Sequence, residues 1–291
     1  MDILDGYIKA SMARPFTPRE TDEKRGDCWF CKICGAQRYG WFDLPSGDSV
    51  FINTSCSCDR RKSDEVKKAE AARTRRMATG MANSIIEKSR FENDLGYCNY
   101  EAVKAAKKYV SEFPENRRSG KGILFWGDVG VGKSFLSYCI ANAVDDMEWT
   151  LRSCVDAERG QYIETPQHYH IYLKRPDQAF RHLLQGDGEF WHIQEITDLV
   201  VISDLGREAP SDRMSEFINS WVDFLYEYGI PCVVTTNLSI DTMMDPDDAR
   251  APAFDRLLSR CEVVRVTSNI GVTARQAERR DIMNGGDNER I

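Results

Sequence analysis

A glycine-rich segment containing one lysine and one serine has the composition and spacing of a phosphate-binding loop. Residues 127–134 match the pattern G-x-x-x-x-G-K-[ST] in full. Glycines let such a loop turn tightly, so that its backbone N–H groups point at phosphate oxygens. Lys133 would contact the β and γ phosphates of a nucleoside triphosphate, and the Ser134 hydroxyl would ligate Mg²⁺. The residues predicted to bind the nucleotide are Gly127, Asp128, Val129, Gly130, Val131, Gly132, Lys133, Ser134 and Phe135.

Five cysteines near the start of the chain have a spacing typical of a zinc site. Cys28, Cys31 and Cys34 recur at three-residue intervals, and Cys56 and Cys58 follow two strand-like segments joined by a turn. Such a hairpin can bring four thiolates to a tetrahedral Zn²⁺, which then stabilises a small module and has no open position for catalysis. A glycine directly after Cys34 permits a tight turn, which favours Cys31, Cys34, Cys56 and Cys58 as ligands, with Cys28 as the alternative. Redox or free thiols are the competing interpretation, but a thioredoxin-like motif needs a βαβ context that is missing here.

Composition places the chain among ordinary globular proteins. It has 291 residues, of which 42% are hydrophobic and 29% charged, and a net charge of −7. This length suits one large or two modest domains. The first residues lack the apolar core of a signal peptide, and no stretch is long and apolar enough to predict a membrane helix. With ten cysteines and no export signal, we expect a reducing cytoplasm and no membrane partner.

One basic segment stands out against this acidic background. It holds eight cations and three acids, and the cations are Arg60, Arg61, Lys62, Lys67, Lys68, Arg73, Arg75 and Arg76. The segment would form a helix over about residues 59–83. It can lie along a nucleic-acid backbone, or it can be a solvated connector with its own i,i+4 ion pairs.

The elements that must position the phosphate loop follow from hydrophobic periodicity. Residues 122–126 form an apolar run that predicts a buried strand, and the residues after Ser134 have helical spacing. Further strands are predicted at 168–173, 199–202, 231–237 and 261–266, and helices at 102–113, 176–184, 214–228 and 253–259. This alternation predicts a three-layer α/β domain with a mostly parallel sheet, and residues 149–167 are predicted to be an insertion.

Two polar residues follow predicted strands of this sheet. Asp204 comes after four aliphatic residues, and Asn237 ends the strand at 231–237. Ligands of such sheets bind at the carboxyl ends of the strands. Asp204 would therefore serve the Mg²⁺ shell or the attacking water, and Asn237 would contact the γ-phosphate or that water. Taken singly, each can equally be a turn former.

The order of these motifs resembles the AAA+ domain of the DnaC/DnaI/IstB group. Its most specific parts are the segments 235–239, Thr-Thr-Asn-Leu-Ser, and 254–261, Phe-Asp-Arg-Leu-Leu-Ser-Arg-Cys. The resemblance implies that residues 127–134 are Walker A, that Asp204 belongs to Walker B and that Asn237 is sensor 1. Arg256 matches the arginine finger, with Arg260 as a nearby alternative, so the nucleotide would be shared between subunits of an oligomer.

The cysteine-rich front end with its basic connector resembles loaders of the DnaI type and their phage relatives. The implied organisation is a helicase-interacting zinc module at 1–60, a basic helical linker at 61–90 and an AAA+ ATP-binding domain at 91–291 without a full C-terminal lid. The implied function is ATP-dependent loading of a hexameric replicative helicase onto single-stranded DNA, in the cytoplasm of a bacterium or a phage-infected bacterium. The alternatives are an IstB-like transposition ATPase, a nucleotide-gated adaptor with little hydrolysis, and a small-molecule kinase, for which no acceptor site is evident.

One departure from the family bears on ATP hydrolysis. The family has two acids at the end of the Walker B strand, and here the first is replaced by Ser203. A hydroxyl brings no charge to Mg²⁺, so we expect ATP binding with weak or absent hydrolysis. Glu208 lies close enough in sequence to be a substitute acid. Arg275, Arg279 and Arg280 are candidates for a second sensor, with no preference among them.

Overall fold

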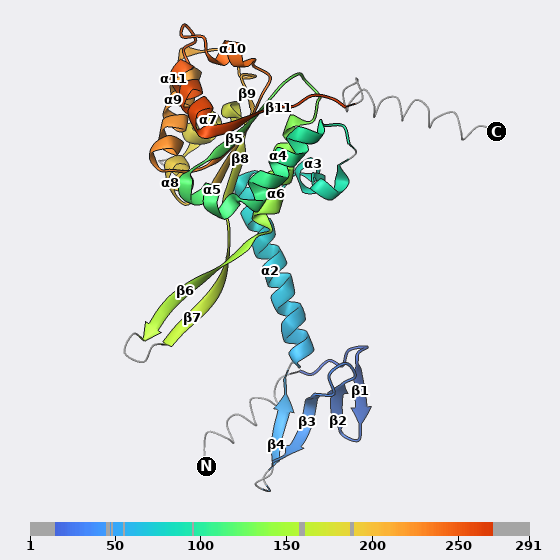
Figure 1. Cartoon of the computed structure of the whole chain (residues 1–291). Helices are drawn as coiled ribbons and strands as arrows, with labels where there is room; N and C mark the ends of the chain where they lie inside the picture. The colour runs from blue at the N-terminus through green and yellow to red at the C-terminus, as the bar shows by residue number, and fades with distance from the viewer. Residues whose placement is uncertain are drawn as a thin grey trace, which may run out of the picture. The chain divides into compact units, whose positions relative to one another are not determined.

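The structure, a computed structural model, divides into two compact units (Figure 1). They comprise Met1–Arg75 and Arg76–Ile291, so the division falls within the segment predicted as a linker. The structure describes residues 15–269 except 45–46, 48, 55, 95, 157–160 and 187–188. The candidate second-sensor arginines Arg275, Arg279 and Arg280 lie outside the described residues.

The first unit is built on a small antiparallel sheet with the strand order β1-β2-β3-β4. Its strands are β1 Asp22–Arg25, β2 Cys28–Cys31, β3 Gln37–Asp43 and β4 Ser49–Asn53. The predicted hairpin is β3–β4, where Trp41 stands opposite Phe51 and their rings meet edge to face at 5.4 Å. Few buried apolar side chains are available in a sheet of this size, so the unit needs a further source of stability.

A long helix, α2 Ser57–Thr79, follows this sheet and ends where Gly80 takes a left-handed backbone with φ +86°. Its final turn belongs to the second unit, where Arg76 pairs with Asp145 at 2.5 Å and donates to the Asn142 side chain at 2.7 Å. Arg76 is therefore a structural anchor, a role that the sequence left open. The helix itself confirms the prediction for residues 59–83.

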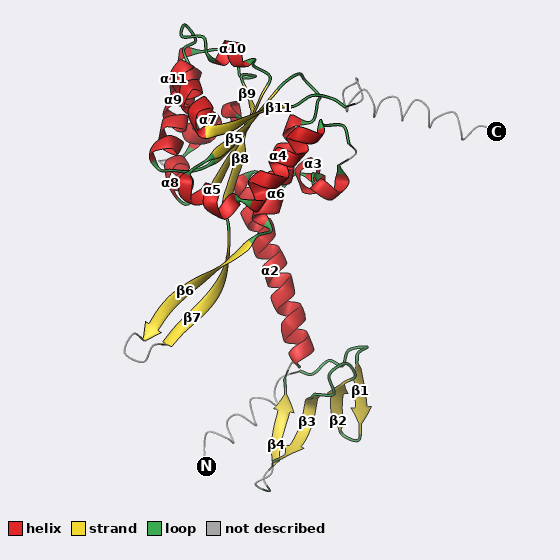
Figure 2. Cartoon of the chain, viewed as in Figure 1, coloured by secondary structure: helices red, strands yellow, loops and turns green. Residues whose placement is uncertain are grey.

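The second unit is a five-stranded parallel sheet between two layers of helices (Figure 2). Its strand order is β11-β5-β10-β9-β8 and every ladder is parallel. The strands are β5 Gly122–Trp126, β8 Ile171–Lys174, β9 Leu199–Leu205, β10 Cys232–Thr236 and β11 Cys261–Arg265. The helices are α3 Ser84–Lys88, the 3-10 turn η1 Phe91–Asn93, α4 Tyr100–Ser111, α5 Phe113–Ser119, α6 Lys133–Asp145, α7 Pro176–Gln185, α8 Glu189–Glu195, α9 Asp212–Glu227, α10 Ile240–Met243 and α11 Ala251–Arg260. The predicted three-layer α/β architecture is confirmed.

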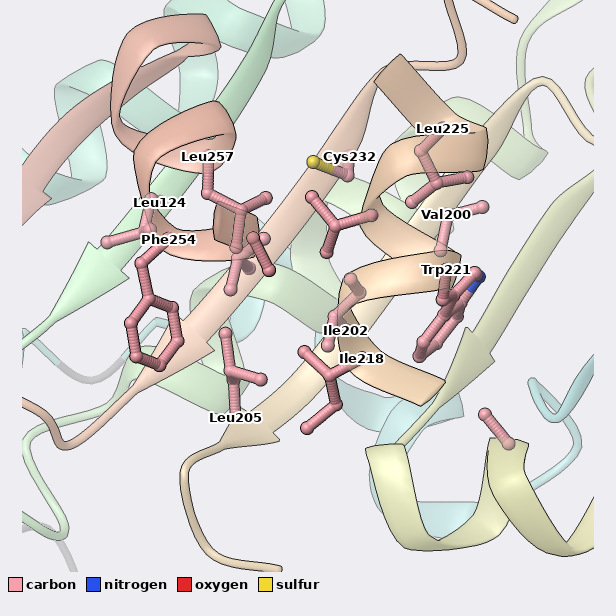
Figure 3. Close-up of a cluster of buried hydrophobic side chains, with 14 of the residues drawn as sticks. Leu124, Val200, Ile202, Leu205, Ile218, Trp221, Leu225, Cys232, Phe254 and Leu257 are labelled. Carbon is pink, nitrogen blue, oxygen red and sulfur yellow. The ribbon is translucent and has the colours of Figure 1, made fainter. Parts of the chain in front are cut away.

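Each face of this sheet has its own hydrophobic core. On one face, side chains such as Ile202 pack against Trp221 of α9 and Phe254 of α11 (Figure 3). On the other face, Ile123 and Val201 pack with side chains of α4 and α6. Because both faces are covered, the strands are apolar throughout rather than alternating, which is why their sequences were recognisable as buried strands. Among the described residues, no helix combines the length and the apolar character that crossing a membrane requires.

The predicted insertion is a two-stranded antiparallel hairpin that extends away from the sheet (Figure 1). It consists of β6 Glu148–Asp156 and β7 Gln161–His168. The prediction of one strand over 168–173 was wrong at its start, because His168 ends the hairpin and the sheet strand begins only at Ile171. Between them, the His170 carbonyl accepts the backbone N–H groups of Asp198 and Leu199. This contact separates the hairpin from the sheet strand.

A glycine in β5 allows two cysteines of the neighbouring strands to approach each other. Cys232 of β10 and Cys261 of β11 flank β5, and their Sγ atoms lie 3.8 Å apart above Gly122. A Cβ on Gly122 would stand 2.5 Å from the Cys232 carbonyl oxygen and 2.6 Å from the Cys261 Sγ. Both thiols are buried, and they pack as small apolar side chains in this core.

The close approach at Gly122 predicts a large effect of a single methyl group. Gly122→Ala should lower the free energy of unfolding by about 1–3 kcal/mol because the strand must shift to relieve the overlap. Gly186→Ala is the matched control, since its added Cβ would meet nothing closer than 3.5 Å. Urea denaturation compares the two. Equal stability of both variants would contradict the packing described here.

Candidate nucleotide-binding site and metal centre

The phosphate loop joins β5 to α6, as predicted, and its glycines adopt conformations that other residues avoid. Gly127, Gly130 and Gly132 have φ values of +142°, +83° and +102°. A Cβ on Gly127 would collide with the Val266 carbonyl, and one on Gly132 would collide with the Cys98 Sγ. The loop therefore needs glycine at these positions both for backbone conformation and for space. Gly132 is the N-cap of α6, so the positive end of the helix dipole faces the loop.

Lys133 closes this loop with its own ammonium group. The Nζ donates to the carbonyl oxygens of Gly127 at 2.7 Å and Asp128 at 2.6 Å, and the residue is 5% exposed. Burial lowers the pKa of Lys133, while the negative charges of Asp204 and Asp128 act in the opposite direction. The lysine and Asp204 thus share one electrostatic environment, although they are far apart in sequence.

The predicted Walker B residue Asp204 sits in a β-bulge. Ile202 stands opposite Val234 but Leu205 stands opposite Thr236, so β9 holds one residue more than β10 over this stretch. Asp204 has φ +57°, the one positive value among the described non-glycine residues. Its backbone N–H donates to the buried Thr235 hydroxyl at 2.9 Å. A bulge of this kind re-aims side chains at the end of a strand and often lies beside a functional site.

Neither Ser203 nor Glu208 provides a second free acid beside Asp204. The Ser203 hydroxyl is buried and lies 3.4 Å from the Tyr138 hydroxyl of α6. Glu208 accepts the Gly206 backbone N–H at 2.9 Å and pairs with Arg250 at 2.9 Å. Glu208 is therefore engaged elsewhere, and of these two acids it is Asp204 whose charge acts on Lys133.

The predicted sensor Asn237 follows β10 directly, between the loops that follow β5 and β9. Thr236 of β10 stands opposite both Trp126 and Leu205. Asn237 is exposed at this edge. The parallel ladders therefore bring the phosphate loop, Asp204 and Asn237 to one edge of the sheet. Ser134 and Phe135 lie in the first turn of α6, where the Phe135 side chain packs against the core beneath the loop.

The two candidate arginine fingers have different surroundings. Arg256 is half-buried and pairs with Asp223 of α9 at 2.7 Å. Arg260 donates to the Tyr226 carbonyl at 2.7 Å, and its guanidinium fits against Gly120 so closely that a Cβ there would overlap it. Arg260 thus holds the end of α9 in place, whereas Arg256 makes a single half-exposed ion pair that can be exchanged.

No protein-family model matches the sequence, and no curated protein matches it significantly. Among solved structures, a crystal structure of the DnaC helicase loader matches with a TM-score of 0.50 and 21% identity, covering 64% of this chain and 100% of that one. The second unit has the AAA+ fold.

Two other solved structures are similar at lower scores. A crystal structure of DnaI matches with a TM-score of 0.44 and 21% identity, covering 63% of this chain and 93% of that one. A putative primosome component from Streptococcus pyogenes matches with a TM-score of 0.44 and 14% identity, covering 64% of this chain and 97% of that one. The AAA+ fold predicted for this chain is confirmed, and it is preceded by a cysteine-containing module.

In that module, four cysteines converge. The Sγ atoms of Cys31, Cys34, Cys56 and Cys58 all lie within 4.8 Å of one another. Four thiolates around a zinc ion at Zn–S bonds of about 2.3 Å would be roughly 3.8 Å apart. The donor set and the spacing therefore fit a structural Cys₄ zinc site. The turn that brings Cys34 to this cluster uses a glycine, Gly35, with φ +69°.

Cys28 lies outside the cluster. Its Sγ approaches the Trp41 carbonyl oxygen at 3.5 Å, and a Cβ on Gly40 would stand 2.6 Å from it. Cys28 and Cys31 begin and end the same strand, and residues three apart in a strand face opposite sides. The alternation of β2 thus separates the two thiols, which the spacing alone did not reveal.

The electrostatics of the cluster also favour a cation. Burial alone would raise the pKa of the Cys56 thiol, but hydrogen bonds from Arg19 and Cys31 lower it to about 7. A hydrogen bond with Cys34 and nearby thiolate charge raise the pKa of Cys58 to about 11. Bound Zn²⁺ would let all four thiols ionise.

Sequence reasoning missed the residues that fix Asp204. Thr235 holds its backbone N–H, Thr236 donates to the Leu205 carbonyl at 2.7 Å, and Tyr138 meets Ser203. Both threonines are fully buried. A pair of adjacent threonines before Asn237 was the available signal, since a fully buried strand otherwise favours aliphatic residues.

The cluster predicts which cysteine the module can lose. The purified chain should carry one zinc ion, and Cys31→Ser should release it and unfold the first unit, because three ligands leave the tetrahedral site incomplete. Cys28→Ser is the matched control and should retain the metal. Elemental analysis gives the zinc content, and tryptophan fluorescence follows the folding of the module. Zinc loss in Cys28→Ser with retention in Cys31→Ser would overturn the assignment.

Proposed function

We propose that this protein is an ATP-dependent loader of a hexameric replicative helicase onto single-stranded DNA, acting in a bacterial cytoplasm. The observation that carries the proposal is a complete phosphate loop, with Lys133 and Asp204 in one electrostatic environment, within the fold of a helicase loader. The backbone N–H groups of residues 127–134 and Lys133 would hold the phosphates of ATP or ADP, and Ser134 and Asp204 would hold Mg²⁺. Bound Mg²⁺ would neutralise the phosphate charge.

Self-association through Arg256 is part of this proposal. Helix α11 ends at Arg260, directly before Cys261, which stands opposite Gly122 at the amino end of β5. The phosphate loop follows the carboxyl end of β5, so the end of α11 lies toward the opposite edge of the sheet. Arg256 lies one turn before this end of α11, so it suits a neighbouring subunit's nucleotide better than its own.

The first unit is proposed to be the helicase-interacting module. Ile33, Trp41 and Phe42 are 70%, 49% and 43% exposed on this small unit. Exposed apolar side chains on a metal-stabilised scaffold suit a protein partner. Arg61, Lys67 and Arg73 of α2 are exposed cations, and they support a contact with the phosphates of single-stranded DNA.

The arrangement around Asp204 favours nucleotide binding over turnover. Ser203 supplies a neutral hydroxyl bonded to Tyr138, and Glu208 is engaged by Arg250. A single carboxylate would then have to serve both Mg²⁺ and the attacking water. We therefore propose that ATP acts here mainly as a switch for association, with slow hydrolysis.

Restoring the missing acid should speed hydrolysis. Ser203→Asp is expected to raise the ATP turnover rate by about tenfold or more, because a second carboxylate can polarise water. Ser203→Asn is the matched control, since it has similar size and no charge, and it should not raise the rate. A coupled phosphate-release assay measures both. An unchanged rate in Ser203→Asp, or wild-type turnover equal to that of a two-acid relative, would refute this explanation.

Loading requires a nucleotide-dependent complex with the helicase. Native mass spectrometry of the chain mixed with its host's hexameric replicative helicase should show a complex that ATP and Mg²⁺ strengthen. Lys133→Ala should lose the ATP dependence, because the ammonium group that contacts the phosphates is gone. No complex in any condition would rule out the loader function. Strong binding to duplex DNA without a helicase would instead favour the transposition ATPase.

A further inference from the structure

A buried carboxylate connects the Walker B turn to the helix that carries Arg256. Glu208 Oε2 accepts the Gly206 backbone N–H at 2.9 Å, and Oε1 pairs with the Arg250 guanidinium at 2.9 Å. The Glu208 side chain is 2% exposed. A carboxylate removed from water to this extent depends on both partners, since either one alone leaves a buried charge only half satisfied.

The other end of this connection is the first turn of α11. Arg250 is the N-cap residue of α11, and its guanidinium also binds both carboxylate oxygens of Asp248 at 2.9 and 2.8 Å. Hydrogen bonds with Asp248 raise the pKa of Arg250, and Arg250 in turn lowers the pKa of Asp248. The guanidinium lies 5.0 Å from the centre of the fully buried Phe254 ring. Arg250 therefore fixes the start of α11 both by charge and by packing.

The turn at Gly206, whose backbone N–H donates to Glu208, is tightly constrained. Gly206 has φ +90°, and a Cβ there would meet the Leu238 side chain at 2.7 Å. The Arg207 N–H bonds back to the Asp204 carbonyl at 3.2 Å. The turn after Asp204 thus packs against Leu238 and is bonded to Glu208. A displacement of this turn therefore displaces Glu208 as well.

Helix α11 is also held by contacts with α9. Asn219 of α9 donates to the Ala249 carbonyl and accepts the Ala253 N–H, while Asp223 of the same helix holds Arg256. The position of Arg256 is therefore determined at the start of α11 by Glu208 and Arg250, and in its middle by α9. Five residues of continuous helix, 251–255, separate Arg250 from Arg256, and a helix transmits a shift of its first turn along its axis.

We propose that Glu208 and Arg250 are a positioning pair, which holds α11 so that Arg256 can reach the nucleotide of a neighbouring copy. This proposal rests on the self-association proposed above. The pair couples the turn after Asp204 to the arginine that the same subunit offers to its neighbour. Glu208 accordingly acts through α11 on the next subunit's nucleotide and does not replace the missing acid in its own site.

Mixed assemblies test this directly. An Arg256→Ala subunit keeps its phosphate loop but offers no arginine, and a Lys133→Ala subunit offers the arginine but binds no ATP. Sedimentation velocity of the mixture with ATP and Mg²⁺ should show association that neither variant shows alone. Glu208→Gln is then added to one partner at a time. It keeps an acceptor for Gly206 and removes the charge that Arg250 binds.

The expected result is asymmetric. Glu208→Gln in the Lys133→Ala subunit should weaken association about fivefold or more, because that subunit supplies Arg256. In the Arg256→Ala subunit it should change association less than twofold. Glu216→Gln on α9 is the matched exposed control in both subunits, and thermal unfolding checks that each variant is folded.

The outcomes separate the two proposals. If the Lys133→Ala and Arg256→Ala subunits do not complement each other, the shared-arginine function itself is wrong. If they complement but Glu208→Gln has no effect in the arginine-supplying subunit, the positioning pair is wrong. Equal weakening from either subunit also overturns it, since that result describes a general structural role.

Discussion

The parallel ladder of β5, β10 and β9 is the constraint on which the candidate site depends. Because β10 pairs with both neighbours at the level of Thr236, the loops that follow the three strands open at one edge. The phosphate loop, Asp204 and Asn237 come from segments that are distant in sequence, and only this register makes them neighbours. The bulge in β9 then turns Asp204 out of the regular strand, with the Thr235 hydroxyl compensating the displaced backbone N–H.

Charge is distributed around this edge in a consistent way. Lys133 is buried in the loop near Asp204, whose negative charge opposes the lowering of the Lys133 pKa by burial. Glu208, the other acid near the turn, is matched by Arg250 and directed toward α11. An acid that lies close in sequence to a nucleotide-site residue therefore need not take part in ATP hydrolysis. Its partners decide whether it acts on the ligand or on a neighbouring element.

The two units are stabilised by different means. The second unit has a buried core on each face of its sheet, enough for a domain of its size. The first unit has a small sheet, a buried Asp22 held by Arg19 and Arg38, and four converging thiols. For such a unit, a metal bound by these thiols would supply free energy that a small core cannot. Its exposed aromatic residues, Trp41 and Phe42, would be available to the proposed partner.

The sequence alone predicted the strands of the parallel sheet, the phosphate loop and a set of four converging cysteines, because each depends on local spacing or a fully apolar run. It did not separate His168 from the strand at Ile171, and it left Cys28, Glu208, Arg76 and the two arginines of α11 open. Those depend on which side chains meet across strands and helices. The tertiary structure decided that Cys28 faces away from the cluster, that Arg76 binds Asp145 and that Glu208 binds Arg250. A long-range ion pair costs desolvation wherever it forms, so its partner is fixed by packing geometry, which local sequence does not encode.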